Sequence, residues 1–151
     1  MALIVILHML SAVIWVGGMF FAYLALRPAA DAVLEPQQKL RLWAVVCARF
    51  FAWVWLAVVV LLVTGVWAVF GKFGGMANAG GLIHVMMGLG GIMILIFLHV
   101  YFAPFRRLKQ AVAANDWELA AGKANQIRML IAINLVLGLI VVCVAAVSGY
   151  H

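Results

Sequence analysis

Three of the four histidines lie in long apolar runs, where an imidazole is costly to keep. His8 lies in the first run, and His84 and His99 lie in the third. Titratable groups inside a membrane are rare and usually face the bundle interior or a cofactor, so these residues are functional candidates. At ~1.5 Å per residue, His8 and His84 lie at comparable depth and can face each other across a bundle. The simpler alternative is a histidine that hydrogen-bonds a neighbouring helix.

The helical faces next to His8 and His84 favour a haem. At helical spacing these faces carry one indole and several glycines: Trp15, Gly18, Gly88 and Gly91. Two imidazoles above strips of small residues are typical of haem b held between two helices, with the histidines as axial ligands of the iron. The leading hypothesis is therefore a bis-histidine haem b protein that performs electron transfer or a haem-linked redox step.

Thioether side chains beside the same histidines favour copper instead. Met9 follows His8, and Met87 lies three residues after His84. Imidazole together with thioether sulfur suits Cu(I), although methionine is also an ordinary core residue. His151 can reach the same site from the end of the fourth run. An outward-facing copper site is therefore the alternative, and a non-catalytic assembly subunit is a third hypothesis.

A second group of polar residues lies toward the other ends of the apolar runs. His99 is about 22 Å further along its helix than His84. Residues on other helices that can approach it are Met19, Arg49, Arg128 and Asn134. A second haem would use His99 with a methionine or another axial ligand; otherwise His99 carries a proton or donates a hydrogen bond. The two arginines either reach lipid phosphate or bind propionates.

The motifs that mark common hydrolases are missing from the sequence. It has no GxSxG, P-loop, HExxH or paired-carboxylate arrangement, and its four acidic residues lie between the apolar runs. No basic motif interleaved with aromatic residues indicates nucleic-acid binding. Hydrolysis and nucleic-acid recognition are therefore not expected, and whether a redox step is catalysed stays open.

Four apolar runs must position these groups. The sequence is 70% hydrophobic and 9% charged, with a mean hydropathy of +1.24, which is typical of membrane proteins. The runs cover about residues 3–26, 50–70, 82–105 and 129–149, each near or above the ~20 residues that cross a bilayer. No basic residue precedes the first run, so we do not expect a removable signal peptide. The sequence predicts an all-α integral membrane four-helix bundle as a single domain over residues 1–151.

The basic residues predict the orientation of this bundle. They cluster around the first and third connections, whereas the second connection has only Lys72. The positive-inside rule then places both termini and the second connection in the periplasm of a bacterial inner membrane. Arg27-Pro28 is expected to end the first helix. Cys47 and Cys143 lie near opposite membrane faces and are expected to be unpaired.

Expected partners follow from the same features. The surrounding lipid bilayer is one, and a haem protein would also need a redox partner or quinone that the sequence does not identify. The glycine-lined faces favour a homodimer, because small residues let helix backbones approach closely.

Two motifs carry a resemblance to known families. Residues 7–18, LHMLSAVIWVGG, resemble the first-helix pattern of small CopD-like membrane proteins, in which a histidine is followed seven residues later by tryptophan and then by small residues. Arg49-Phe50 leading into residues 62–66, LVTGV, is similar to the second helix of that family. This resemblance implies a role in copper uptake or tolerance.

A related group, the HemJ-type protoporphyrinogen oxidases, is similar at four positions. These are His8, His99, Arg128 and Asn134. The resemblance implies bound haem b. The sequence departs from that group in reading Arg27-Pro28 where the group has Pro-Arg, and in having Leu135 after Asn134 instead of an acid.

Overall fold

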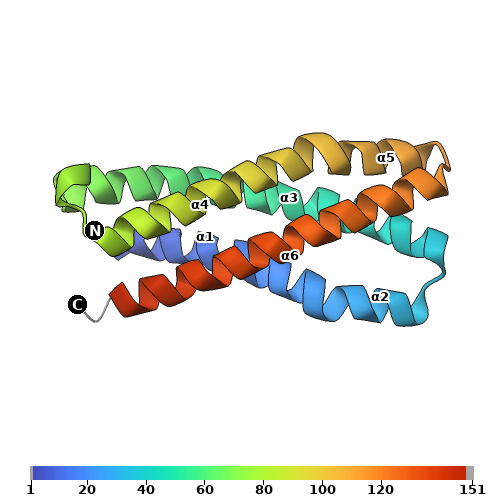
Figure 1. The fold of residues 1–151 in the computed structure, drawn as a ribbon, viewed down its shortest axis with the longest axis horizontal. Coiled ribbons are helices and arrows are strands. Elements are labelled where there is room, and N and C mark those ends of the chain that lie inside the picture. Colours follow the sequence, from blue (N-terminus) through green and yellow to red (C-terminus); the bar gives the residue numbers. More distant parts are fainter. Residues whose placement is uncertain (1, 149–151) are drawn as a thin grey trace.

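The computed structural model describes residues 2–148, and this part of the chain contains helices and no strands. Figure 1 shows them as an elongated bundle. In chain order the segments are α1 (Ala2–Phe21), η1 (Ala22–Leu26), α2 (Arg27–Val33), α3 (Pro36–Trp67), η2 (Ala68–Lys72), η3 (Met76–Asn78), α4 (Gly81–Val100), η4 (Tyr101–Phe105), α5 (Arg106–Ala113) and α6 (Trp117–Ser148).

Consecutive segments merge into four long helical spans. The spans Ala2–Val33, Pro36–Lys72, Gly81–Ala113 and Trp117–Ser148 contain 32, 37, 33 and 32 residues, and each is long and apolar enough to cross a membrane. The all-α architecture with four membrane-spanning helices is therefore confirmed. A 32-residue helix is roughly 48 Å long, well beyond the ~30 Å of hydrocarbon. The extra length arises because the first and third polar connections are themselves largely helical.

Two prolines are accommodated by π-helical turns. The prediction that Arg27-Pro28 ends the first helix is wrong, because η1 precedes Pro28 and the helix continues through α2. Pro104 lies inside a second such segment, η4. Proline lacks an N–H group, and in an α-helix its ring clashes with the carbonyl four residues earlier. A π turn is wider, because its hydrogen bonds span five residues instead of four, and it relieves this clash. Both helices therefore extend beyond their apolar runs.

The basic connections form short turns at one end of the bundle, which we call the basic end (α2, α5 and residues 34–35 and 114–116). Pro36 begins α3, where Glu35 and Gln38 form a capping box. In the other turn, Asn115 adopts a φ of 55°, and Asp116 Oδ1 accepts a hydrogen bond from the Leu119 N–H at 3.2 Å. Local capping thus makes both turns tight.

The opposite end carries His8 and His84, and we call it the His end. It comprises the first half of α1, the connection between α3 and α4, the first half of α4 and the last turns of α6. Gly74 and Gly75 have φ values of 69° and 121°, a region that favours glycine, so this connection turns sharply before η3. The described chain begins and ends at this end (Figure 1), as expected for termini on one side; the compartment they face stays a prediction.

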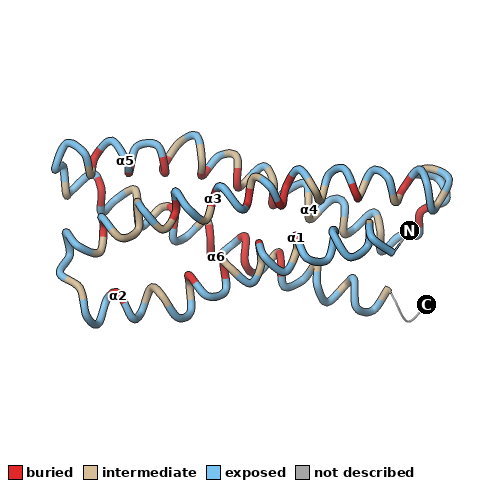
Figure 2. Tube along the Cα trace, turned by 180° about the vertical axis from the view of Figure 1, so that it is seen from behind, coloured by how far each residue is buried: buried red, intermediate tan, exposed pale blue. Residues whose placement is uncertain are grey.

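Two helical hairpins pack against each other to form the bundle. α1 packs along α3, α4 packs along α6, and the hairpins meet where α6 contacts α1 and α3 and where α5 contacts α3. Buried residues concentrate in the middle and toward the basic end (Figure 2). Leu108 and Ala120 are 0% exposed there, whereas the first buried residue of α4 is Met93. The His end is therefore the more open half of the bundle.

Candidate metal site at the His end

His8 is anchored to the neighbouring helix by Thr64. Its Nδ1 lies 2.7 Å from Thr64 Oγ1. This hydrogen bond joins the neighbouring helices α1 and α3. Gly65 follows, and a Cβ at that position would lie 3.8 Å from Cε1 of the imidazole. An added Cβ would therefore meet the imidazole at an ordinary van der Waals distance, so Gly65 lies beside His8 without crowding it.

The hydroxyl of Thr64 links His8 to the backbone of α3. Thr64 Oγ1 lies 2.6 Å from the carbonyl oxygen of Val60, which can only accept, and 2.7 Å from Nδ1 of His8. When the hydroxyl donates its hydrogen to Val60, the bond with His8 has Nδ1–H as the donor. The lone pair of His8 then resides on Nε2, which is the arrangement found in metal-ligating histidines whose second nitrogen is held by a hydrogen bond.

His84 has the same protonation pattern by a different route. Its Nδ1 lies 3.1 Å from the carbonyl oxygen of Gly80, one turn earlier at the start of α4. Since this oxygen can only accept, Nδ1 carries the hydrogen and Nε2 carries the lone pair. Both histidines are exposed rather than enclosed in the core. Two imidazoles at the His end thus offer Nε2 to a ligand.

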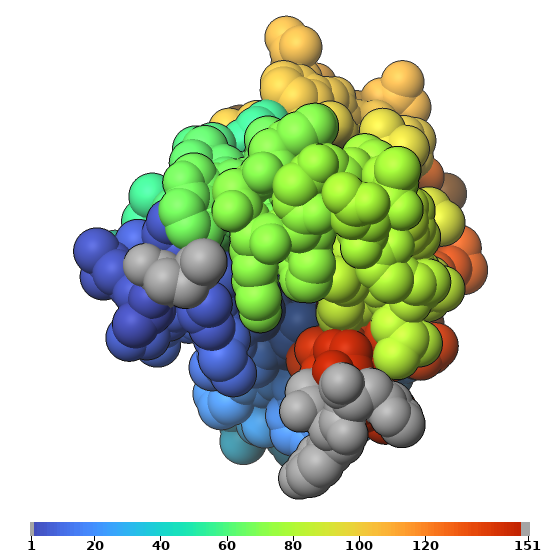
Figure 3. Space-filling view, turned by 90° about the vertical axis from the view of Figure 1, so that its left-hand side faces the viewer, coloured from blue at the N-terminus to red at the C-terminus, as the bar shows by residue number. Residues whose placement is uncertain are grey.

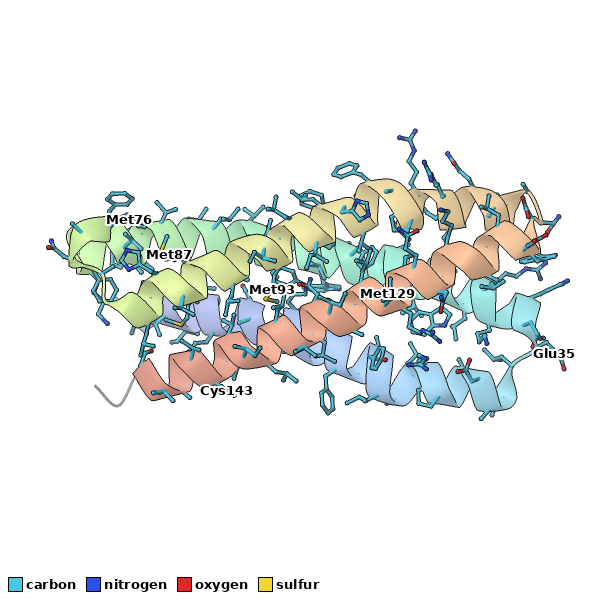
Figure 4. The ribbon with its side chains drawn as sticks, viewed as in Figure 1. Glu35, Met76, Met87, Met93, Met129 and Cys143 are labelled. Carbon is cyan, nitrogen blue, oxygen red and sulfur yellow. The ribbon has the colours of Figure 1, made fainter. Side chains whose placement is uncertain are left out.

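Methionines accompany the two histidines. Met9 is exposed on α1, and Met76 and Met87 are exposed on the α3–α4 connection and on α4. Figure 4 shows Met76 and Met87 at the His end and Met93 in the middle of the bundle. The end-on view shows the His end hollowed between α1, the α3–α4 connection and α6 (Figure 3). Soft sulfur donors are therefore available on the same part of the molecule as the imidazoles.

The packing does not fit a haem between α1 and α4. The expected clearance beside Gly18 is filled, because a Cβ there would lie 2.2 Å from Cε2 of Phe50. Trp15 is buried against Phe97, with ring centroids 6.2 Å apart, and belongs to the aromatic core. α1 and α4 are also not principal packing partners, because α1 packs along α3 and α4 along α6.

The glycines of α4 do not line the interior either. Gly88 and Gly91 are exposed, and a Cβ at either would have no atom within 4 Å. They lie on the exposed surface of the helix, as His84 does. Residues 2–148 also contain no group of three or more His, Cys, Asp or Glu residues that could hold a metal ion. A metal site at the His end therefore has to combine imidazole with donors of another kind.

Of the residues expected around His99, the structure brings Met19 and Asn134 to one cavity. His99 and Arg49 are exposed, whereas Met19 and Asn134 are buried in the core. Asn134 donates from Nδ2 to the carbonyl of Met93 at 3.2 Å, and its Oδ1 is buried without a partner. Asn134 and Met19 both line a cavity of about 20 Å³ in the middle of the bundle.

Three further predictions concern residues outside this site. Arg128 is exposed and lines a larger cavity at the basic end. Cys47 is buried and Cys143 is exposed, and both are unpaired, as expected. His151, a candidate copper ligand, lies outside the described residues.

Thr64 and Gly65 are the functional candidates that residue types alone did not single out. They belong to the LVTGV motif, which was recognised only as a resemblance. The available signal was the depth of Thr64: a hydroxyl in an apolar run, at a level that a histidine of the preceding helix can reach. Sequence spacing indicates depth, but only the packing of α1 on α3 shows that these two side chains meet.

Comparison with known proteins identifies one family. Residues 44–148 match the family described as Copper resistance protein D (CopD). This match includes Thr64, Gly65 and His84 and begins beyond the helix that carries His8. No curated protein and no solved structure matches the chain.

Proposed function

The chain belongs to the copper resistance protein D family, and from this premise we propose that it binds Cu(I) at the His end and carries it through the membrane. A copper-resistance-related, multi-pass membrane protein needs a site where the ion is captured. The observation that carries the proposal is the hydrogen bonding of His8 and His84, because Nδ1 of each is hydrogen-bonded and Nε2 is left for a metal ion.

Methionine sulfur supplies the remaining donors of the capture site. Thioether and imidazole ligands select Cu(I) over the hard cations that prefer carboxylates. Met9 and Met87 are exposed near the two histidines in sequence, and each is a flexible side chain that can adjust to a small ion. This donor set also accounts for copper binding where no cluster of His, Cys and acidic residues exists among residues 2–148.

The interior of the bundle offers soft donors for passage toward the basic end. Met93, Met19 and Cys47 are at most 3% exposed, and they are contributed by α4, α1 and α3. Met19 and Asn134 both line the 20 Å³ cavity, Asn134 Oδ1 has no hydrogen-bond partner, and Cys47 lines the larger cavity at the basic end. Cu(I) moves along this series by exchange of ligands, without a change of oxidation state.

The orientation follows from the basic residues. With the basic end in the cytoplasm, the capture site faces the periplasm of a bacterial inner membrane. Copper delivered from the periplasm then meets His8 and His84 before it enters the bundle. The second connection, with Gly74 and Gly75, lies beside this entry.

The capture site is tested by anaerobic Cu(I) titration of the detergent-purified protein against a chromophoric Cu(I) chelator. We expect stoichiometric binding that falls by at least tenfold in His8→Ala and in His84→Ala. His99→Ala is the matched control, because His99 is also exposed but belongs to the other half of α4. Unchanged affinity in both His8→Ala and His84→Ala contradicts the proposed site.

Passage is tested separately in liposomes that contain a Cu(I)-sensitive dye. Met19→Leu conserves side-chain volume but removes the sulfur, so we expect slower copper entry with unchanged affinity at the His end. A visible spectrum of the same preparation addresses the haem hypothesis. A Soret band that His8→Ala abolishes would replace copper capture with haem ligation as the role of His8.

A further inference from the structure

A cavity at the basic end has the character of a second binding site. Its volume is about 250 Å³, and it lies among η1, α2, α3 and α6, with α5 contributing Leu108. The cationic side chains that line it are Arg27, Lys39 and Arg128, and Asp31 is the only acidic one. Copper capture at the His end uses none of these charged residues, and the proposed copper path meets the cavity only at Cys47. The charged part of the cavity therefore requires a separate explanation.

The charge of this cavity is positive after internal pairing. Lys39 Nζ lies 2.8 Å from Asp31 Oδ1, and this is the only salt bridge within residues 2–148. Arg27 and Arg128 consequently have no carboxylate partner. The guanidinium carbon of Arg27 lies 4.9 Å from the centroid of the Tyr23 ring, so a cation–π contact holds this side chain beside the cavity. Two guanidinium groups without an ion-pair partner among residues 2–148 thus line the same cavity.

The rest of the lining is apolar. Leu40, Cys47 and Leu108 are buried residues of this wall, and Trp43 and Ile131 extend it. A ligand that satisfies both parts must carry a compact anionic group next to an apolar body. Guanidinium groups match phosphate oxygens with paired hydrogen bonds, and basic pockets between transmembrane helices bind anionic lipid headgroups.

We propose that this cavity binds an anionic phospholipid, with Arg27 and Arg128 holding its phosphate and one acyl chain lying along the apolar wall. Its position favours a lipid over a free anion, because the cavity lies where the helices emerge from their apolar runs. Arg27 and Arg128 mark this level, because they adjoin the ends of the first and fourth apolar runs. The bound lipid would tie the α1–α3 hairpin to α6 at the end opposite to copper capture.

The proposal is tested by native mass spectrometry of the full-length protein released from nanodiscs of phosphatidylcholine with or without phosphatidylglycerol. We expect one phosphatidylglycerol retained per chain, and at least a tenfold loss of retention in Arg128→Gln. Arg107→Gln is the matched control, because it removes the same charge from an exposed position that does not line the cavity. Equal losses in the two variants would reduce the effect to general surface charge and overturn the proposal.

A gain of binding provides a second test that misfolding cannot mimic. Asp31→Asn releases Lys39 from its ion pair and raises the positive charge of the cavity, so retention of phosphatidylglycerol should increase severalfold. No change or a decrease contradicts the proposed role of these charges. Titration with inorganic phosphate distinguishes a lipid site from a phosphate site. If inorganic phosphate displaces phosphatidylglycerol at a concentration comparable to that of the lipid, the cavity recognises free phosphate and the lipid proposal is overturned. Cu(I) affinity measured on the same variants keeps this outcome independent of copper capture.

Discussion

The His end and the basic end of the bundle bury their side chains in different ways. Toward the basic end, Phe105 is 2% exposed and its ring packs edge-on against Phe51, with centroids 4.9 Å apart. At the His end, residues 2–10 of α1 and 81–92 of α4 include no buried residue. Most apolar side chains there would contact lipid rather than another helix.

This difference separates two tasks within one bundle. A tightly packed end holds the helices in register, since dense contacts resist local opening. An end with few interhelical contacts can change its helix spacing at low cost, which suits the entry of a small ion. The residues proposed to capture copper lie in the open half, and the cavity with unpaired guanidinium groups lies in the closed half.

The largest expected effect tests the packing of the closed half. Phe105→Ala removes a ring that packs against Phe51 and Tyr101, and we expect it to lower the free energy of unfolding by about 3–5 kcal/mol. Phe70→Ala is the matched variant at the His end, where Phe70 is 64% exposed, and it should cost less than about 1 kcal/mol. Denaturant titration in detergent measures both. Equal losses would remove the distinction between the two ends.

The next effect tests whether the glycines face the interior or the exterior. Gly18→Val places a side chain against the ring of Phe50, and overpacking of this kind costs about 1–3 kcal/mol. Gly88→Val should be tolerated, because a Cβ at Gly88 has no atom within 4 Å. Thermal unfolding of the two variants gives the comparison. Severe destabilisation by Gly88→Val would show that a partner or a cofactor covers this face.

A smaller effect tests the link between α1 and α3 at the His end. Thr64→Val keeps the side-chain shape but removes the hydrogen-bond partner of His8 Nδ1, so the imidazole is no longer held in place on α3. We expect Cu(I) affinity to fall about tenfold, the lower range for loss of a hydrogen bond to a metal ligand. Thr64→Ser retains the hydroxyl and should bind as the unmodified protein does. Equal affinities for the valine and serine variants would exclude this role of Thr64.

The smallest effect is expected at the boundary between the two halves. Asn134→Leu loses the hydrogen bond to the Met93 carbonyl but also removes an Oδ1 that is buried without a partner. These changes oppose each other, so the free energy of unfolding should change by about 1 kcal/mol or less. A loss as large as that of Phe105→Ala would place Asn134 among the residues that hold the bundle together.

Much of the architecture could be predicted from the sequence. Four apolar runs predicted the four helices, and the depth of His8 marked it as a residue that needs a partner. The ends of the helices were harder to predict from the sequence, because π-helical turns let the helices continue past Pro28 and Pro104. The sequence could not show that the space beside Gly18 is filled. The ring that fills it belongs to Phe50, which lies 32 positions further along the chain.

Hydrophobicity by itself determined that this chain forms four membrane-length helices, and the positions of its basic residues determined which end carries the charge. Only the tertiary structure decided how each helix is rotated: His8 meets Thr64 on α3, whereas His84, Gly88 and Gly91 lie on the exposed surface of α4. The physical reason is that lipid is as apolar as a protein core, so a membrane helix shows little difference between its inner and outer faces. Interhelical packing and a few polar contacts make that choice.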